Sequence, residues 1–295
     1  MRVTSSRRET SSYEVCEMRD AVEHKDADSG HIEEMWRLML GSGESPLHRG
    51  RRLYRKLPAS PRCKVCYSPF GGLGKILMRL PGGRRPGRMN PHFCNVCEDY
   101  ARAHIGGVEL ELTMLFADIR GSTPLAERLG TREFARLIDR FYRAASDVLI
   151  ASDALIDRLL GDEVVGLFVP AFSGERHSQT GLAAAEALLR ATGHADAGGP
   201  WVPVGVAVHT GIAFVGSVGS EAARDITVLG DNANLTARLA SQAGVGEILI
   251  SQATATAAGI DTTGLESRHL ELKGRSAAAD VWVRLVSGDG TASSQ

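Results

Sequence analysis

The stretch Leu115-Phe116-Ala117-Asp118-Ile119-Arg120-Gly121-Ser122-Thr123 decides the fold, because it carries an acidic residue out of an apolar strand and into a turn. Before it, residues 109–112 alternate with the two-residue period of a half-buried strand, and residues 114–117 continue as an apolar run. Asp118 is therefore expected at a strand end, where its carboxylate can hold a hard cation. An aspartate before Gly-Ser-Thr-Pro is also common as a turn or helix-cap residue, so both interpretations stay open here.

Length and composition set the broad class of the protein. The chain has 295 residues, of which 43% are hydrophobic, and this suits one large globular domain with a smaller module. It contains no run of roughly 18 apolar residues, so we expect no transmembrane segment. The first residues, Met1 to Arg8, lack the apolar core of a signal peptide, and this predicts a cytoplasmic protein.

Four of the five cysteines form two C-x-x-C pairs within a basic segment. In a reducing compartment such clustering favours a metal site over disulfides, and four thiolates saturate a tetrahedral zinc ion. An iron–sulfur cluster with four cysteine ligands is the alternative cofactor, and two unrelated buried pairs are the alternative without a metal. The predicted ligands are Cys63, Cys66, Cys94 and Cys97.

The composition changes along the chain, and this predicts four segments. Residues 1–30 are a flexible tail, residues 31–104 a helical and cysteine-rich module, residues 108–286 the main domain and residues 287–295 a second tail. In the module we expect a short helix over residues 31–40. The glycine-rich residues 69–76 do not match a phosphate-binding P-loop. The arginines of residues 81–88 suit contact with nucleic acid or an anionic membrane, or simply a solvated basic face.

The main domain alternates strands with helices. Two apolar runs joined at Gly161-Asp162 predict a hairpin, and helices are expected to begin at a Thr131 cap and at Asp231. This order predicts an α/β (α+β) fold with a mixed, partly antiparallel sheet. A further helix is expected over residues 181–191, and further strands over residues 201–209, 212–218, 226–229, 247–250, 269–272 and 281–286.

Two carboxylates and one helix form a candidate constellation. Asp118 ends a strand and Asp162 lies at the hairpin tip, so the pair suits two magnesium or manganese ions, which prefer oxygen ligands. On the helix that begins at Asp231, Asn234 and Arg238 are four residues apart and share one face. That face can present an amide and a fixed cation.

With these motifs in their order, residues 108–286 resemble the catalytic domain of class III nucleotidyl cyclases, the adenylate and guanylate cyclases. The resemblance implies a ferredoxin-like core and a head-to-tail homodimer whose active sites are shared between chains. The motifs that carry it are residues 115–123, 161–165, 209–211 with 215–219, 227–238 and 272–274.

The resemblance also implies a role for each site residue. Asp118 and Asp162 of one chain would bind two Mg²⁺ or Mn²⁺ ions, and Asn234 and Arg238 of the partner would orient the ribose and neutralise charge on the transferring phosphorus. Lys273 would grip the triphosphate. In the base pocket, Arg158 stands where the family has a lysine, and Thr227 stands where adenylate cyclases have an acidic partner.

The function expected from the resemblance is that of an adenylate cyclase regulated by the cysteine module. It would convert ATP to 3′,5′-cyclic AMP and pyrophosphate by a two-metal mechanism. Arg158 departs from the family pattern, because arginine is larger and forked, and Ile212 replaces a triphosphate-binding arginine found in some members. The alternatives are a weak or inactive cyclase-like nucleotide-binding dimer, and a guanylate cyclase.

Overall fold

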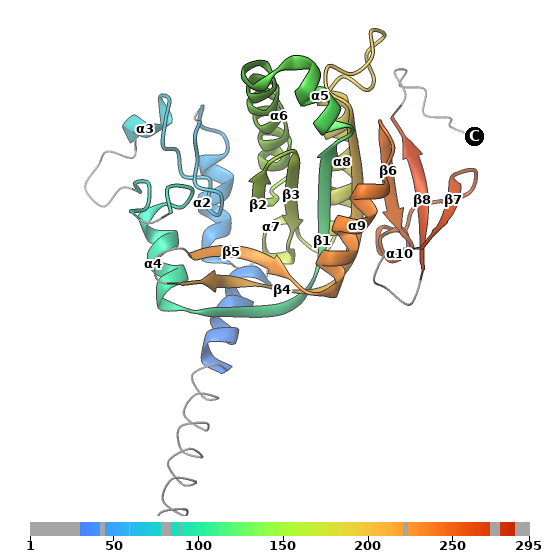
Figure 1. Ribbon diagram of the computed structural model, residues 1–295. Helices are drawn as coiled ribbons and strands as arrows, with labels where there is room; N and C mark the ends of the chain where they lie inside the picture. Colours follow the sequence, from blue (N-terminus) through green and yellow to red (C-terminus); the bar gives the residue numbers. More distant parts are fainter. Residues whose placement is uncertain are drawn as a thin grey trace, which may run out of the picture.

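The computed structural model describes residues 30–41, 45–58, 60–77, 84–88, 90–220, 224–271 and 278–286. Lys273 and the two predicted tails, apart from Gly30, lie outside these residues. A mixed sheet of eight strands forms the centre, with the order β2-β3-β1-β4-β6-β8-β7, while β5 pairs with β4 (Figure 1). The strands are β1 Gly106–Ile119, β2 Leu155–Leu160, β3 Glu163–Phe168, β4 Val204–Gly219, β5 Arg224–Leu229, β6 Glu247–Ser251, β7 Glu266–Leu270 and β8 Ala279–Leu285.

The α/β fold with a partly antiparallel sheet is confirmed. Within the residues that the structure describes, every strand pairing is antiparallel except that between β4 and β6. The predicted hairpin is also present, because β2 and β3 pair from Leu160 and Glu163 outward and leave Gly161-Asp162 as the turn. Gly161 has a φ of +64°, a conformation that glycine adopts without steric cost.

Alternate residues of β1 face opposite sides of the sheet, as the two-residue period requires. Leu115, Ala117 and Ile119 lie in a core with α6 Thr131–Ala151, α8 His177–Ala191 and α10 Gln252–Ala258. Leu112, Met114 and Phe116 lie in the other core, which includes α9 Asp231–Gln242. The smaller helices of the main domain are α5 Ser122–Leu129 and α7 Pro170–Ser173.

The cysteine-rich module packs on the same face of the sheet as α9. It contains a helix over residues 30–40, as expected, together with α2 Pro46–Tyr54, α3 Gly74–Leu77 and α4 Asn95–Ala103. Trp36 and Phe93 belong to the same hydrophobic core as Leu112, so the module and the sheet share buried surface. In Figure 1 the module lies beside β5 and the β2 edge. The basic segment that becomes α2 was not predicted as a helix.

Two predicted features of the main domain are wrong. Thr131 is not a cap: Gly130 precedes α6 and no side chain caps the helix. The strands expected over residues 201–209 and 212–218 are one continuous strand, β4, because its antiparallel pairing with β1 runs without interruption through Gly211. No helix of the described residues is both long and apolar enough to cross a membrane.

Candidate functional site

The two predicted metal-binding carboxylates lie at the same end of the sheet. Asp118 is the penultimate residue of β1 and pairs with Glu163, the first residue of β3. The main-chain oxygen of Asp162 accepts a hydrogen bond from the amide of Ile119 at 3.2 Å. The strand end and the hairpin turn are therefore hydrogen-bonded to each other, which places the two aspartates on adjacent segments.

The immediate surroundings of Asp118 suit a cation. Its Oδ2 pairs with the guanidinium of Arg120, which also donates to the main-chain oxygen of Ser241 at 2.9 Å. Its Oδ1 is buried and has no hydrogen-bond partner among the described residues. A buried carboxylate oxygen is costly to leave without a partner. A divalent metal ion, which prefers oxygen ligands, would provide that partner for Oδ1. Burial lowers the pKa of Arg120, and the charge of Asp162 raises it.

The predicted base-pocket residues are in direct contact. Arg158 on β2 donates from Nη2 to the hydroxyl of Thr227 on β5 over 3.3 Å. Between them lies Asp157, whose side chain is fully buried and accepts from Arg158 Nε at 3.0 Å and from the amide of Val228 at 3.1 Å. Burial raises the pKa of Asp157, while the charges of Lys64 and Arg158 act in the opposite direction.

Asn234 and Arg238 share α9, as predicted, and this helix packs in the same hydrophobic core as Val228 of β5. Asn234 is exposed and Arg238 is half-buried. No hydrogen bond or ion pair within the described part of the chain joins either residue to Asp118 or Asp162. The structure thus places Asp118 next to the Asp162 turn and puts Asn234 and Arg238 on one helix. Within the described residues, no hydrogen bond or ion pair connects the two aspartates with the two helix residues.

A buried histidine fixes the start of α9. His209 Nε2 lies 3.0 Å from Asn232 Oδ1, and Nδ1 lies 2.8 Å from Ser251 Oγ. Asn232 also donates to the main-chain oxygen of Ile212 at 2.8 Å. A side chain at Gly211 would meet the Asn232 amide at 2.8 Å, so glycine is required for this close approach. His209 belongs to the core, and it holds the helix that carries Asn234.

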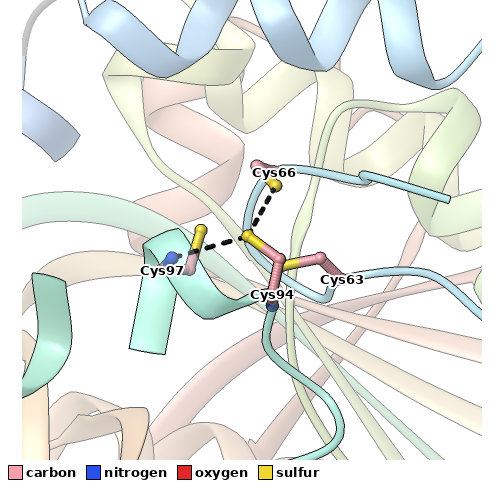
Figure 2. A group of neighbouring side chains, drawn as sticks. All are labelled: Cys63, Cys66, Cys94 and Cys97. Atoms are coloured by element: carbon pink, nitrogen blue, oxygen red, sulfur yellow. Dashed lines mark hydrogen bonds between the residues drawn. The ribbon is translucent and has the colours of Figure 1, made fainter. Parts of the chain in front are cut away.

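The four predicted metal-binding cysteines converge at one point (Figure 2). Their sulfur atoms all lie within 4.8 Å of one another and all four residues are buried. Cys63 and Cys66 come from a tight turn, whereas Cys94 caps α4 and Cys97 lies in its first turn. This arrangement gathers four sulfur ligands at one point, and its donor chemistry fits zinc.

Hydrogen bonds at the cysteine cluster shift the pKa values of the four thiols in opposite directions. The amide of Cys97 donates to Cys94 Sγ over 3.4 Å, and the amide of Cys94 donates to Cys63 Sγ over 3.2 Å. Hydrogen bonds with the neighbouring thiols lower the pKa of Cys94 and Cys66 and raise the pKa of Cys97, while burial raises the pKa of Cys63. Arg84, one of the arginines considered for nucleic-acid contact, instead donates to Cys94 Sγ over 3.7 Å.

Three residues of these sites escaped the sequence analysis: Lys64, Asp157 and Arg120. A signal for Asp157 was present, since it is an acidic residue in an otherwise apolar run, directly before Arg158. Lys64 carried no such signal, because its partners Asp157 and Asp225 are distant in the sequence.

Comparisons with known proteins assign the main domain. The sequence profile of the family described as "Adenylate and Guanylate cyclase catalytic domain" matches residues 109–284, more than half of the chain. An adenylate cyclase of Anabaena cylindrica is 27% identical over 146 residues, which cover 43% of this chain and 26% of that protein. The chain therefore spans about a quarter of the length of that relative.

Two solved structures share the fold of the main domain at equal identity. The guanylyl cyclase Cya2 is 26% identical, with a TM-score of 0.56 over 64% of this chain and 98% of that chain. The adenylyl cyclase CyaB from P. aeruginosa is 26% identical, with a TM-score of 0.52 over 59% of this chain and 93% of that chain. Similarity to these two structures therefore does not distinguish an adenylate cyclase from a guanylate cyclase.

Proposed function

This chain belongs to the adenylate and guanylate cyclase catalytic domain family, and we propose that it converts ATP to 3′,5′-cyclic AMP and pyrophosphate. The observation that carries the proposal is the buried Oδ1 of Asp118, which lies beside the Asp162 turn and has no hydrogen-bond partner in the described part of the chain. A carboxylate oxygen of this kind can act as a ligand to a divalent cation that also binds the phosphates of a substrate. The cyclisation of a nucleoside triphosphate depends on such a cation.

Asp118 and Asp162 would hold two Mg²⁺ or Mn²⁺ ions. When bound, these ions would lower the pKa of the ribose 3′-hydroxyl and offset the charge of the phosphates. The 3′-oxygen then bonds to the α-phosphorus, the bond to pyrophosphate breaks, and the hydroxyl proton passes to solvent. Arg120, which pairs with Asp118, would give up that ion pair where a metal ion binds the carboxylate, and would keep its hydrogen bond to the main-chain oxygen of Ser241.

The remaining roles belong to residues that position the substrate. Arg238 would neutralise charge on the transferring phosphorus, Asn234 would orient the ribose and Lys273 would bind the triphosphate. Since phosphoryl transfer depends mainly on positioning and on electrostatic stabilisation, these three groups supply what the reaction needs. Because no hydrogen bond or ion pair of the described residues connects Arg238 with the carboxylates, we propose that they meet across a homodimer interface.

ATP is the proposed substrate because of the contact between Arg158 and Thr227. A hydroxyl oxygen accepts from the amino group of adenine, and an arginine donates to a ring nitrogen of the purine. The exposed fraction of the Arg158 side chain is 39%, so the guanidinium remains within reach of a ligand.

At the second site, we propose that the four cysteines hold one structural zinc ion that stabilises the module. The support is the convergence of four buried sulfur atoms from a turn and a helix start. The proposed contribution of this ion is to the folding of the module, since structural zinc sites couple metal binding to folding.

The test of the cyclase proposal is a product assay on the purified full chain. ATP and GTP are incubated side by side with Mg²⁺ or Mn²⁺, and cyclic nucleotide and pyrophosphate are measured. We expect equal amounts of cyclic AMP and pyrophosphate from ATP, less product from GTP, and none from Asp162→Ala. Absence of cyclic nucleotide from both substrates with both metals would refute the proposal.

A further inference from the structure

The proposed base pocket lies between two strands that are not neighbours in the sheet. In the part of the chain that the structure describes, β2 pairs with β3 and β5 pairs with β4. Two hydrogen bonds cross from strand to strand: Arg158 of β2 donates to the hydroxyl of Thr227 at 3.3 Å, and the amide of Val228 donates to the carboxylate of Asp157 at 3.1 Å. The width of the pocket therefore depends on contacts that join β2 and β5 directly.

Lys64, in the turn between Cys63 and Cys66, makes a contact of this kind from outside the sheet. Its ammonium donates to the main-chain oxygen of Asp157 on β2 at 2.8 Å and pairs with Asp225 Oδ1 on β5 at 2.5 Å. The side chain of Lys64 is only 11% exposed, so salt and water screen the ion pair less than they would on an open surface. One cation of the module thus bridges the two strands of the pocket.

The contact on β2 is made at a β-bulge. The residues on either side of Asp157 pair with Gly166 and Val165, which are consecutive in β3, so Asp157 is the extra residue of the bulge. A bulge takes a main-chain group out of the ladder. At this position the main-chain oxygen of Asp157 accepts from Lys64 instead.

A second segment of the module contacts β5 and its partner β4. Asn90 donates from Nδ2 to the main-chain oxygen of Arg224, the first residue of β5, at 3.2 Å. Ser217 of β4 donates from Oγ to the main-chain oxygen of Ala101 in α4 at 2.7 Å. The segment that contains α4 is therefore attached to the β4–β5 hairpin, whereas the Lys64 turn is attached to both β2 and β5.

The cysteine cluster joins these two segments of the module. One C-x-x-C pair lies on the Lys64 turn and the other at the start of α4 (Figure 2). The amide of Lys64 also donates to the main-chain oxygen of His92 at 2.9 Å, just before that second pair. A metal ion bound by all four sulfur atoms would fix the turn against α4, and would thereby fix the Lys64 ammonium against β2 and β5.

We propose that Lys64 is a positioning residue that couples the cysteine cluster to the nucleotide-base pocket, so that nucleotide binding depends on the metal of the cluster. This inference rests on the proposed function, since both the pocket and the metal belong to it. Lys64 acts by holding β2 and β5 together and does not itself contact the nucleotide. Loss of the metal would loosen the turn and weaken binding, although every residue that contacts the nucleotide is still present.

The test measures equilibrium binding of α,β-methylene-ATP, which cannot release pyrophosphate, to the full chain with Mn²⁺. We expect Lys64→Met to weaken binding about fivefold, because both contacts of the ammonium are lost. This variant should retain the metal content of the wild-type protein, since all four cysteines remain. Lys64→Arg, which keeps the charge and the donors, should restore most of the affinity. Lys75→Met, an exposed lysine on α3, is the matched control.

The dependence on the cluster is tested by combining variants. Cys63→Ser with Cys97→Ser should remove the metal and weaken binding by a similar factor. In that background Lys64→Met should change the affinity by less than about twofold, because contacts that act as one unit are not additive. Losses that multiply would show that the cluster and Lys64 act independently, and would overturn the coupling.

The outcomes separate this inference from the cyclase proposal. If wild-type protein binds the analogue but makes no cyclic nucleotide, the proposed function fails and the binding comparison alone decides the inference. Folded, metal-containing Lys64→Met that binds as tightly as wild-type protein overturns the inference, and wild-type protein that does not bind the analogue overturns both. Should Lys64→Met not fold, Asp225→Ala decides, since that side chain is 50% exposed and accepts one of the two Lys64 contacts. We expect binding about two- to threefold weaker, and an unchanged affinity overturns the inference.

Discussion

Lys64 Nζ lies 2.8 Å from the main-chain oxygen of Asp157, and this contact joins the turn between two cysteines to the strand that carries Arg158. A second contact of the same amine, with Asp225, joins that turn to β5. The cysteine module is therefore part of the wall around the proposed base pocket. Changes in the module are expected to be measurable both in stability and in nucleotide binding.

The first prediction concerns the metal of the cysteine cluster. Purified protein should contain one zinc ion per chain, and Cys63→Ser with Cys97→Ser should remove it, because two thiolate ligands are lost. The thermal midpoint should fall by at least about 5 °C, since metal binding contributes to folding. Elemental analysis and thermal unfolding measure the two effects.

Cys16→Ser is the matched control for that prediction, since Cys16 lies outside both C-x-x-C pairs. It should retain the zinc and the thermal midpoint of the wild-type protein. Iron with absorption in the visible range would identify a cluster in place of zinc. Protein that lacks any metal and still unfolds at the same temperature as the double variant would argue against a metal site.

The second prediction concerns Arg51 of α2, which is buried against the residues just before β2. Its guanidinium donates to the main-chain oxygens of Asp153 and Ala154, each at 3.0 Å, and stacks 3.9 Å from the ring centroids of Tyr67 and Phe172. Replacing it with methionine removes the hydrogen bonds to both carbonyls, of which only that of Ala154 keeps another donor among the described residues, the hydroxyl of Tyr67. This should lower the free energy of unfolding by about 2–4 kcal/mol.

Urea unfolding of Arg51→Met measures this loss. The neighbouring Arg52→Met is the control, because Arg52 is exposed on the same helix, and it should stay within about 0.5 kcal/mol of the wild-type protein. Equal effects of the two substitutions would show that the buried guanidinium has no special part in docking the module.

The third prediction is a pH dependence of stability that comes from His177. Its Nδ1 lies 2.9 Å from Thr113 Oγ1, and burial lowers its pKa from the ordinary value of 6.5, against the smaller effect of Glu111. Below pH 6.5, His177 is therefore protonated in the unfolded chain, whereas in the folded chain it binds its proton only at a lower pH. Stability should fall as the pH drops from 6.5 through the lower folded-state pKa.

Urea titrations between about pH 5 and 7 test this sign. His177→Gln should reduce the slope of unfolding free energy against pH, leaving the share of His194, whose pKa burial also lowers. His31→Gln, an exposed position, should retain the wild-type slope. A steeper slope in His177→Gln would contradict the assigned direction.

The fourth prediction concerns Arg238 on α9. Because its proposed contact develops with the charge of the transition state, Arg238→Ala should lower kcat about 1,000-fold while KM for ATP changes much less. Arg190→Ala, an exposed cation on α8, should leave both constants unchanged. Steady-state kinetics with ATP measure the split, and a loss confined to KM would assign Arg238 to ground-state binding instead.

The sequence was informative where local pattern and chemistry coincide. The period of two residues located β1 and placed Asp118 at its end, and Gly161-Asp162 between apolar runs located the hairpin. Helical spacing placed Asn234 and Arg238 on one helix. These features depend on residues close in the chain, so their physical signals are local.

Other features depend on contacts between distant residues. The docking of the module through Arg51 and Lys64 involves partners about 90 to 160 positions away in the chain, and no local pattern encodes such pairs. The continuity of β4 through Gly211 also escaped prediction. Glycine normally weakens a strand interior, but here it makes room for Asn232.

The most direct test of a site shared between two copies of the chain is complementation between two inactive variants. Asp162→Ala lacks a proposed metal ligand and Arg238→Ala lacks the proposed transition-state cation, so on this account each homodimer has two defective sites. A mixed dimer would contain one intact site, and random mixing at equal concentration should restore about a quarter of the wild-type activity. Mixtures that remain as inactive as the separate variants, although mixed dimers form, would contradict the account.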